Sequence, residues 1–171
     1  MCVCVCVCLC KHTHIQTQMS NPVSVDKVVD LVKQHQDVLL LDVRYPYEFS
    51  GGHIIGAHNY PSRSSLSEYE IKRRLEIPVI VYCEFSSIRA PECARNILKE
   101  GTFVNVYVMT GGYNAFVQKY PQFCKSDDIY NLYRRQHIAP ETMPLLKGQF
   151  DEYQKMELVY QKKYSKINDP F

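Results

Sequence analysis

Cys83 and Arg89 lie at the two ends of the stretch CEFSSIR (83–89), with five residues between them. Their types and their spacing point most directly to a catalytic function. A cysteine thiolate is a nucleophile. An arginine stays charged at any working pH and can donate two parallel hydrogen bonds to two phosphate oxygens. The backbone amides of these seven residues would form a ring large enough for a tetrahedral oxyanion. The spacing therefore predicts phosphoryl transfer to Cys83, followed by hydrolysis of the phosphocysteine.

The sequence on either side of this loop predicts where it lies in the fold. The run IPVIVY (77–82) has the continuous apolar pattern of a strand buried on both faces, and residues 90–100 are expected to form a helix. Ligands of α/β folds bind at the carboxyl ends of parallel strands, where the N–H groups and dipole of the next helix favour an anion. The same field favours the thiolate of Cys83. A lone cysteine after a strand is most often a core residue, so the surrounding motifs decide between the two interpretations.

The rest of the central region alternates strands and helices over short connections. Ser24 is a candidate N-cap for a helix over SVDKVVDLVKQH (24–35), in which valines recur at helical spacing. A short extended piece is expected to end at GAHNYP (56–61). Further strands are expected at 37–43 and 105–110, and further helices at 64–75 and 111–120. This alternation predicts an α/β layer fold with a parallel sheet.

The N-terminal segment (1–19) differs from the rest in composition. Five of the eight cysteines alternate with valine and leucine in MCVCVCVCLC (1–10). A strand with one thiol-bearing face would suit a soft metal or would be prone to aggregation, but the spacing lacks the C-x2-C form of a zinc site. We interpret the segment as the low-complexity sequence that a dinucleotide repeat would encode. In the protein it would be either disordered or not translated, with Met19 as a candidate start.

Residues 20–126 make up the expected domain, and residues 127–171 a C-terminal extension that ends in a helix. In that helix, apolar and aromatic residues recur at steps of three or four: Phe150, Tyr153, Met156, Tyr160, Tyr164 and Ile167. This pattern favours a helix that packs on the domain, and docking of a partner protein is the alternative.

Composition excludes several classes of protein. With 171 residues, the chain is expected to hold one domain and a short appendage. Its 46% hydrophobic and 22% charged residues are typical of globular proteins, and a formal net charge of +2 argues against nucleic acid or a membrane surface as the main partner. No apolar run approaches the ~20 residues of a membrane-spanning helix, and no signal peptide is visible. We expect a reducing compartment, the cytoplasm and/or the nucleus, and no metal or organic cofactor.

Three separated motifs resemble, in order, the catalytic domain of the M-phase inducer phosphatases: LLLDVRYPYEFSGGHIIGAHNYP (39–61), CEFSSIRAP (83–91) and VYVMTGGYNAFVQKYPQFC (106–124). These dual-specificity phosphatases activate cyclin-dependent kinases, and their fold is the rhodanese fold. The resemblance covers residues 24–126. It implies a rhodanese-like three-layer α/β domain with a central parallel sheet and helices on both faces, to which the C-terminal helical extension is added.

The resemblance also implies roles for the loop residues. Cys83 would be the nucleophile, and Arg89 would grip the phosphate. A phosphate or sulfate would lie in a phosphate-binding loop made of Glu84, Phe85, Ser86, Ser87, Ile88 and Arg89.

Four residues outside the loop are expected to support it. Asp42 and Arg44 would form an ion pair beneath the site, and Glu48 and His53 would close hydrogen bonds within their own segment. The glycine pair 111–112 would supply the tight turn from strand to helix.

The chain departs from the family's pattern next to the nucleophile and next to the arginine. Ile88 stands where family members carry a glutamate that is one candidate for the general acid. This leaves Glu84, or a proton already on the substrate phosphate, as the donor to the leaving oxygen. Tyr82 replaces the usual histidine, which removes one neighbour able to form a cation.

A further departure concerns oxidation. Family members have a second cysteine that can shelter the oxidised nucleophile in a disulfide, and here that position is Val43. Cys83 therefore lacks that resolving partner unless Cys93 serves instead.

Together these features predict a cysteine-dependent protein phosphatase that acts on phosphotyrosine and phosphothreonine. The expected protein partner is a phosphorylated cyclin-dependent kinase in cell-cycle control. Leu98 and Gly101 stand near positions where family members dock the kinase through arginines. Docking is therefore expected to be altered, or to rest on Arg134, Arg135 and the terminal helix.

Two other functions remain open at this stage. Small rhodanese-fold arsenate reductases share the C-x5-R loop, and some carry the RAP sequence found here at 89–91. Arsenate mimics phosphate, so the loop alone does not separate the two activities. A non-catalytic module that binds a phosphoprotein is the third hypothesis.

Overall fold

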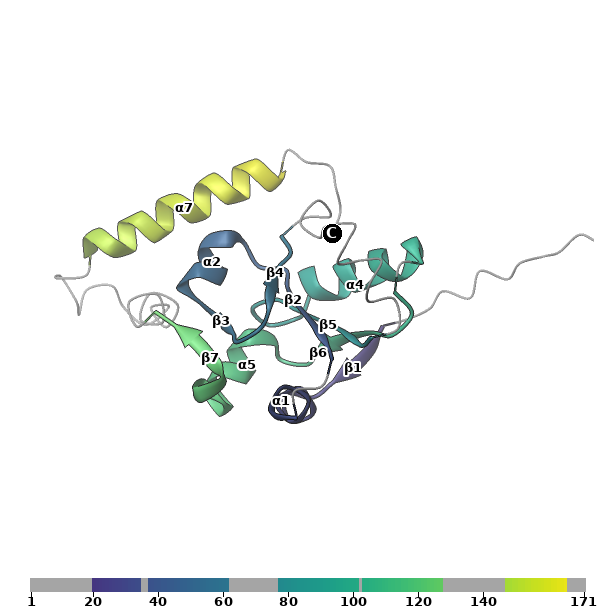
Figure 1. The fold of residues 1–171 in the computed structure, drawn as a ribbon. Coiled ribbons are helices and arrows are strands. Elements are labelled where there is room, and N and C mark those ends of the chain that lie inside the picture. The colour runs from purple at the N-terminus through teal and green to yellow at the C-terminus, as the bar shows by residue number, and fades with distance from the viewer. Residues whose placement is uncertain (1–19, 35–36, 62–76, 102, 128–146, 166–171) are drawn as a thin grey trace, which may run out of the picture.

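The computed structural model of the protein describes five stretches of the chain (Figure 1): residues 20–34, 37–61, 77–101, 103–127 and 147–165. Four sequence-based expectations lie outside the described residues. They concern the N-terminal repeat, the helix at 64–75, the arginines at 134 and 135, and Ile167.

A five-stranded parallel sheet forms the centre of the domain, with strand order β1-β6-β5-β2-β4. The two middle strands are buried at every position, which explains why their sequences are continuous apolar runs. The strands are β1 (Asn21–Val23), β2 (Leu39–Asp42), β4 (His58–Asn59), β5 (Val79–Tyr82) and β6 (Val106–Met109). The expected strands are confirmed, and β1 is an addition. This edge strand contains Pro22, a residue that sheets tolerate at their edges.

Helices cover both faces of this sheet (Figure 1). On one face, α4 (Arg89–Glu100) packs on Leu39, Leu41, Val79 and Val81 of β2 and β5. On the other face, α1 (Val25–Lys33) and α5 (Gly112–Lys119) pack on Leu40 and Ile80 of the same strands. Alternate residues of a strand point to opposite faces, so the two middle strands supply both cores. The expected three-layer α/β fold with a central parallel sheet is thereby confirmed.

Helix α1 begins where the sequence predicts. The side-chain oxygen of Ser24 accepts a hydrogen bond of 3.2 Å from the backbone N–H of Lys27. This contact satisfies one of the free N–H groups of the first turn. Ser24 is therefore the N-cap.

A second, two-stranded sheet was not expected from the sequence. The segment PYEFSGGHI forms a short helix, α2 (Pro46–Gly51), followed directly by β3 (Gly52–Ile54). After the 3-10 turn η2 (Pro121–Phe123), β7 (Cys124–Ser126) pairs antiparallel with β3. A helix of six residues is too short to show helical periodicity, and for this reason the sequence pattern indicated only a loop.

The terminal helix α7 (Lys147–Ser165) runs across α2 on the outside of the domain (Figure 1). Its contact is aromatic, since the ring of Tyr160 lies 6.0 Å from the ring of Tyr45 and 5.6 Å from that of Tyr47. Leu158 and Val159 of the same helix remain exposed. None of the described helices is long and apolar enough to span a membrane.

We expect Tyr160→Ala to loosen α7 from the domain, because an aromatic contact of this kind contributes about 0.5–1.5 kcal/mol beyond the buried area. Hydrogen exchange of the α7 amides measures this. Val159→Ala is the matched control, since tyrosine and valine have similar helix propensities and Val159 is 64% exposed. Equal exchange rates in the two variants would show that the Tyr160 contact does not hold the helix.

Candidate active site

The CEFSSIR loop joins the carboxyl end of β5 to the start of α4, as the sequence predicts. Cys83 follows Tyr82, the last residue of β5, and Arg89 is the first residue of α4. The Cys83 side chain belongs to the core on the α4 side of the sheet and is 4% exposed. The backbone N–H of Cys83 points to the hydroxyl oxygen of Ser86 at 3.4 Å, and Ser86 has a left-handed backbone with φ 54°. The loop therefore turns back over its own first residue.

The N-terminus of α5 holds the first half of this loop. The N–H groups of Tyr113 and Asn114 donate to the carbonyl oxygens of Cys83 and Glu84, at 2.9 and 3.0 Å. In a trans peptide the N–H points opposite to the carbonyl. The amides that follow these two carbonyls, those of Glu84 and Phe85, therefore point away from α5.

Gly112 makes this close approach possible. Its φ of 61° lies in the left-handed region, and a Cβ at this position would lie 2.4 Å from the carbonyl oxygen of Cys83 and 2.6 Å from that of Glu84. Any other residue would thus push α5 and the loop apart. The glycine pair therefore does more than allow a turn, because it sets the distance between α5 and the loop.

Arg89 is oriented by a carboxylate from another part of the chain. Its Nη1 and Nη2 donate to the two carboxylate oxygens of Glu48 at 2.7 and 3.1 Å, and its guanidinium lies 5.0 Å from the centre of the Tyr45 ring. Burial alone would lower the pKa of Arg89, but the hydrogen bonds and charge of Glu48, with a smaller contribution from Cys83, raise it above its ordinary value. Arg89 therefore stays protonated at every working pH.

Glu48 joins two structures that lie far apart in the sequence. It accepts a hydrogen bond of 2.8 Å from the backbone N–H of Tyr45 and so caps α2. Sequence reasoning expected contacts within this segment only and missed the pair with Arg89. No local signal indicates that pair, because 41 residues separate its members.

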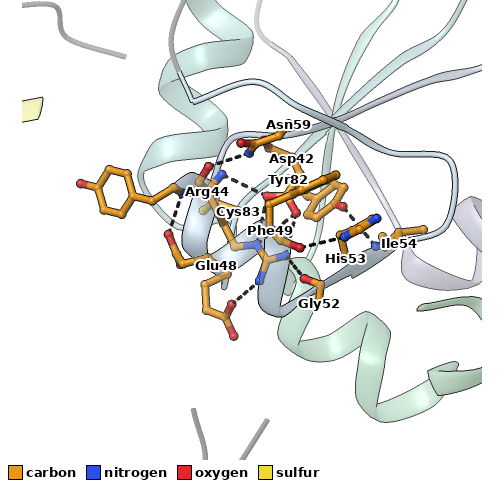
Figure 2. Close-up of polar contacts among 12 residues, drawn as sticks. Asp42, Arg44, Glu48, Phe49, Gly52, His53, Ile54, Asn59, Tyr82 and Cys83 are labelled. Carbon is orange, nitrogen blue, oxygen red and sulfur yellow. Dashed lines mark hydrogen bonds and ion pairs between the residues drawn. The ribbon is translucent and has the colours of Figure 1, made fainter. Parts of the chain in front are cut away.

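A second arginine, Arg44, lies fully buried beneath the loop (Figure 2). Its guanidinium donates to both carboxylate oxygens of Asp42, with a shortest distance of 2.6 Å, and to the carbonyl oxygen of Gly52 at 2.6 Å. Nη1 donates to Oε2 of Glu84 at 3.1 Å, and the guanidinium stacks 4.0 Å from the centre of the Tyr113 ring. Burial by itself lowers the pKa of Arg44, but the charge and hydrogen bonds of Asp42 outweigh it and raise that pKa well above its ordinary value.

Asn59, which the sequence did not single out, completes this arrangement. Its side-chain amide donates to the backbone carbonyls of Asp42 and Arg44 at 3.0 and 2.8 Å (Figure 2). The amide thus holds β4 against the end of β2. Asn59 is the second residue of the two-residue strand β4, and a lone asparagine there gives no sequence signal of this role.

The Glu84 side chain points into the protein. Its Oε2 contacts an arginine with no exposed surface, and the Glu84 side chain itself is only 16% exposed. Phe85 and Ile88, in contrast, are 60% and 70% exposed, and Ser87 is exposed beside them. The loop therefore presents apolar groups outward and its acidic group inward.

His53 and Tyr82 lie away from the nucleophile. The Nδ1 atom of His53 is 2.8 Å from the carbonyl oxygen of Phe49, and the two rings stack at 3.8 Å. Tyr82 points to the opposite face of the sheet from Cys83, where its hydroxyl oxygen accepts a hydrogen bond of 3.4 Å from the N–H of Ile54. Burial raises the pKa of Tyr82, so its hydroxyl stays neutral. Among the described residues, no group of three His, Cys, Asp or Glu side chains is arranged to hold a metal ion.

Comparison with known proteins gives a family match over more than half of the chain. The sequence model of the rhodanese-like domain matches residues 24–119. M-phase inducer phosphatase 3 of Bos taurus is 31% identical over 58% of this chain and 24% of its own length. M-phase inducer phosphatase 2 of Homo sapiens is 33% identical over 53% of this chain and 18% of its own length. The chain thus spans less than a third of the length of these relatives. The resemblance of its three motifs to the M-phase inducer phosphatases is confirmed.

Solved structures show the same fold at low sequence identity. A Saccharomyces cerevisiae homologue of single-domain rhodanese and of the Cdc25 phosphatase catalytic domain superposes with a TM-score of 0.55, at 18% identity, over 68% of this chain and 93% of that chain. An As-Sb reductase from Leishmania major superposes with a TM-score of 0.50, at 23% identity, over 63% of this chain and 86% of that chain. These two likenesses concern the fold alone.

We expect Gly112→Ala to lower the free energy of unfolding more than Gly101→Ala does. Both glycines have a positive φ, so alanine costs roughly 1–2 kcal/mol of backbone strain at either position. A Cβ at Gly101 meets no atom within 4 Å, whereas one at Gly112 meets the backbone of the loop. Denaturant titration compares the two variants. Equal losses of stability would contradict the close approach of α5 to the loop.

We expect peroxide inactivation of the protein to be poorly reversed by dithiothreitol. Val43 lies in the core cluster that holds Cys83 and offers it no thiol, so the oxidised sulfur is open to further, irreversible oxidation. Cys93 lies in the same cluster, and Cys93→Ser is the control, which should leave the recovery equally poor. Full recovery of the wild-type protein would contradict the prediction. If that recovery were lost in Cys93→Ser, Cys93 would be identified as a resolving thiol.

Proposed function

The chain belongs to the rhodanese-like domain family, and we propose that within this family it is a cysteine-dependent protein phosphatase acting on phosphotyrosine and phosphothreonine. One observation carries the proposal. A single seven-residue loop between β5 and α4 has a thiol at one end and, at the other, an arginine whose guanidinium Glu48 orients. The similarity to proteins named M-phase inducer phosphatases supports the same reaction class.

The positions of Cys83, Arg89 and the loop amides suggest a role for each of them in the reaction. The thiolate of Cys83 attacks phosphorus, the S–P bond forms, and the P–O bond to the leaving oxygen breaks. Arg89 and the loop amides stabilise the charge on the transferred phosphoryl group. Water then attacks the phosphocysteine, releases phosphate and restores the thiolate.

Glu48 prepares Arg89 for this task. A guanidinium held by two hydrogen bonds has lost most of its rotational freedom before the phosphate arrives, so little entropy is lost on binding. Its remaining N–H donors stay available to phosphate oxygens. The same carboxylate caps α2, so the position of α2 and the orientation of Arg89 are fixed together.

The proposed partner is a phosphorylated cyclin-dependent kinase in the cytoplasm and/or the nucleus. The two positions near which family members are expected to carry docking arginines have structural tasks here. Leu98 packs against the core under α4, and Gly101 ends that helix with a left-handed φ of 69°. Kinase recognition would therefore use other surfaces, such as the outer side of α7.

Arsenate reduction is the second candidate. The fold likeness to the As-Sb reductase supports it only as far as the scaffold, and the loop would hold arsenate as it holds phosphate. A module that binds a phosphoprotein without catalysis is the third candidate. An oriented Arg89 would serve binding as well as catalysis, whereas the thiol at the base of the loop favours catalysis.

We expect the protein to release phosphate from an aryl phosphate between pH 5 and 8. This release should disappear in Cys83→Ser, which keeps the size of the side chain and removes the nucleophile.

Arg89→Lys keeps the charge but loses the guanidinium that donates two parallel hydrogen bonds, so a fall of about 10²-fold or more in kcat/KM is expected. Arg89 contributes no ionisation to the pH profile in this range.

Three outcomes would contradict the proposal. Turnover that survives in Cys83→Ser would exclude a phosphocysteine. Absence of turnover from the folded wild type, with arsenite formed from arsenate in the presence of glutathione and glutaredoxin, would identify a reductase. Binding of a phosphopeptide without either reaction would identify a binding module.

A further inference from the structure

The carboxyl groups that surround the loop are each engaged by an arginine. Both oxygens of Glu48 accept hydrogen bonds from Arg89, and both oxygens of Asp42 accept hydrogen bonds from Arg44. Glu84 turns inward to the same buried Arg44. Asp42 and Glu48 are buried, and the Glu84 side chain points into the protein. These three groups therefore hold the two arginines in place and are not exposed on the outer side of the loop.

The outer side of the loop carries hydrocarbon where the leaving group of a substrate would lie. Ile88 directly precedes Arg89 and is 70% exposed, and Phe85 on the same loop is 60% exposed. A phosphate held by the loop amides and Arg89 would project its ester oxygen outward, past these two side chains. Neither side chain has a proton to give, and both offer apolar contact to a ring.

A proton donor to the leaving oxygen is more important for some substrates than for others. General acid catalysis contributes about 10²–10⁴-fold to a rate by protonating the leaving oxygen. A phenoxide, whose conjugate acid has a pKa of about 10, leaves without that help far more readily than an alkoxide, whose conjugate acid is nearly as weak as water at about 15.7. The rate of an enzyme without a proton donor at this point therefore depends strongly on the basicity of the leaving oxygen.

We propose that Ile88 makes this site selective for aryl phosphate monoesters, such as phosphotyrosine, over alkyl esters, such as phosphothreonine. The inference rests on the proposed phosphatase function and narrows its substrate class. In the first step the S–P bond to Cys83 forms while the P–O bond breaks, and the electron pair stays on a phenoxide that takes its proton from solvent. Hydrolysis of the phosphocysteine by water completes the cycle without a further reactant.

The test is the dependence of kcat/KM on the leaving group, measured with the full chain on a series of substituted phenyl phosphates. The wild type should show a steep fall as the phenol becomes more basic. A phosphotyrosine peptide should be cleaved about 10²-fold or more faster than the same peptide with phosphothreonine. This dependence registers a proton donor from any part of the chain, including segments outside the described residues.

Ile88→Glu should flatten the dependence and raise the rate on phosphothreonine, because it adds a carboxyl group on the outer side of the loop. Ile88→Gln is the matched control, with the same size and polarity but no acidic proton, and should remain as steep as the wild type. Glu92→Gln is a second control, because Glu92 lies one helical turn after Ile88 and its side chain is partly exposed. A steeper dependence in that variant would identify Glu92 as the donor and overturn the proposal.

The outcomes separate this inference from the function on which it rests. Cys83-dependent turnover with a shallow leaving-group dependence, or with equal rates on the two peptides, would overturn the selectivity and leave the phosphatase intact. No phosphate release from even the least basic phenol would overturn both.

Discussion

The structure of the site depends on the burial of Arg44. A fully buried guanidinium is tolerated only when its charge and N–H groups are matched, and here Asp42, Glu84 and the carbonyl of Gly52 match them. These partners come from the end of β2, from the CEFSSIR loop and from β3. Removing one partner of a buried ion pair costs roughly 3–5 kcal/mol. Arg44 therefore holds the three segments in one arrangement, because its buried charge would strongly destabilise the folded protein in any other arrangement.

Arg44 and Arg89 have different roles in the site. Arg44 is fully buried and fixes the loop from beneath, whereas Arg89, at the end of the loop, retains 24% exposure of its side chain. Glu48 orients Arg89 and caps α2, and α2 in turn carries the aromatic surface on which Tyr160 of α7 packs. The terminal helix is thus linked to Arg89 through one short helix. A rhodanese-like fold hosts several chemistries, so this arrangement of charged groups, and not the fold, carries the functional argument.

The sequence was sufficient for the elements that bury a regular pattern and for the two residues at the ends of the loop. Strands β2, β5 and β6 are continuous apolar runs, and α1 has a capping serine before its first turn. The pattern failed where elements are too short to have a period, as in β1, α2 and the pairing of β3 with β7. It also failed for contacts between distant segments. Glu48 and Arg89 are 41 residues apart, and Arg44 and Glu84 are 40 residues apart, so only the folded chain brings them together.

The proposed reaction requires that Cys83 accepts the phosphoryl group. Rapid acid quenching of the wild-type protein during turnover of an aryl phosphate, followed by peptide mass spectrometry, measures this transfer directly. We expect one phosphoryl group on the peptide that contains Cys83, present during turnover and lost as the substrate is consumed. Phosphate found on another residue during turnover would contradict a phosphocysteine at Cys83. So would a burst of phenol release that is not accompanied by any phosphorylated peptide.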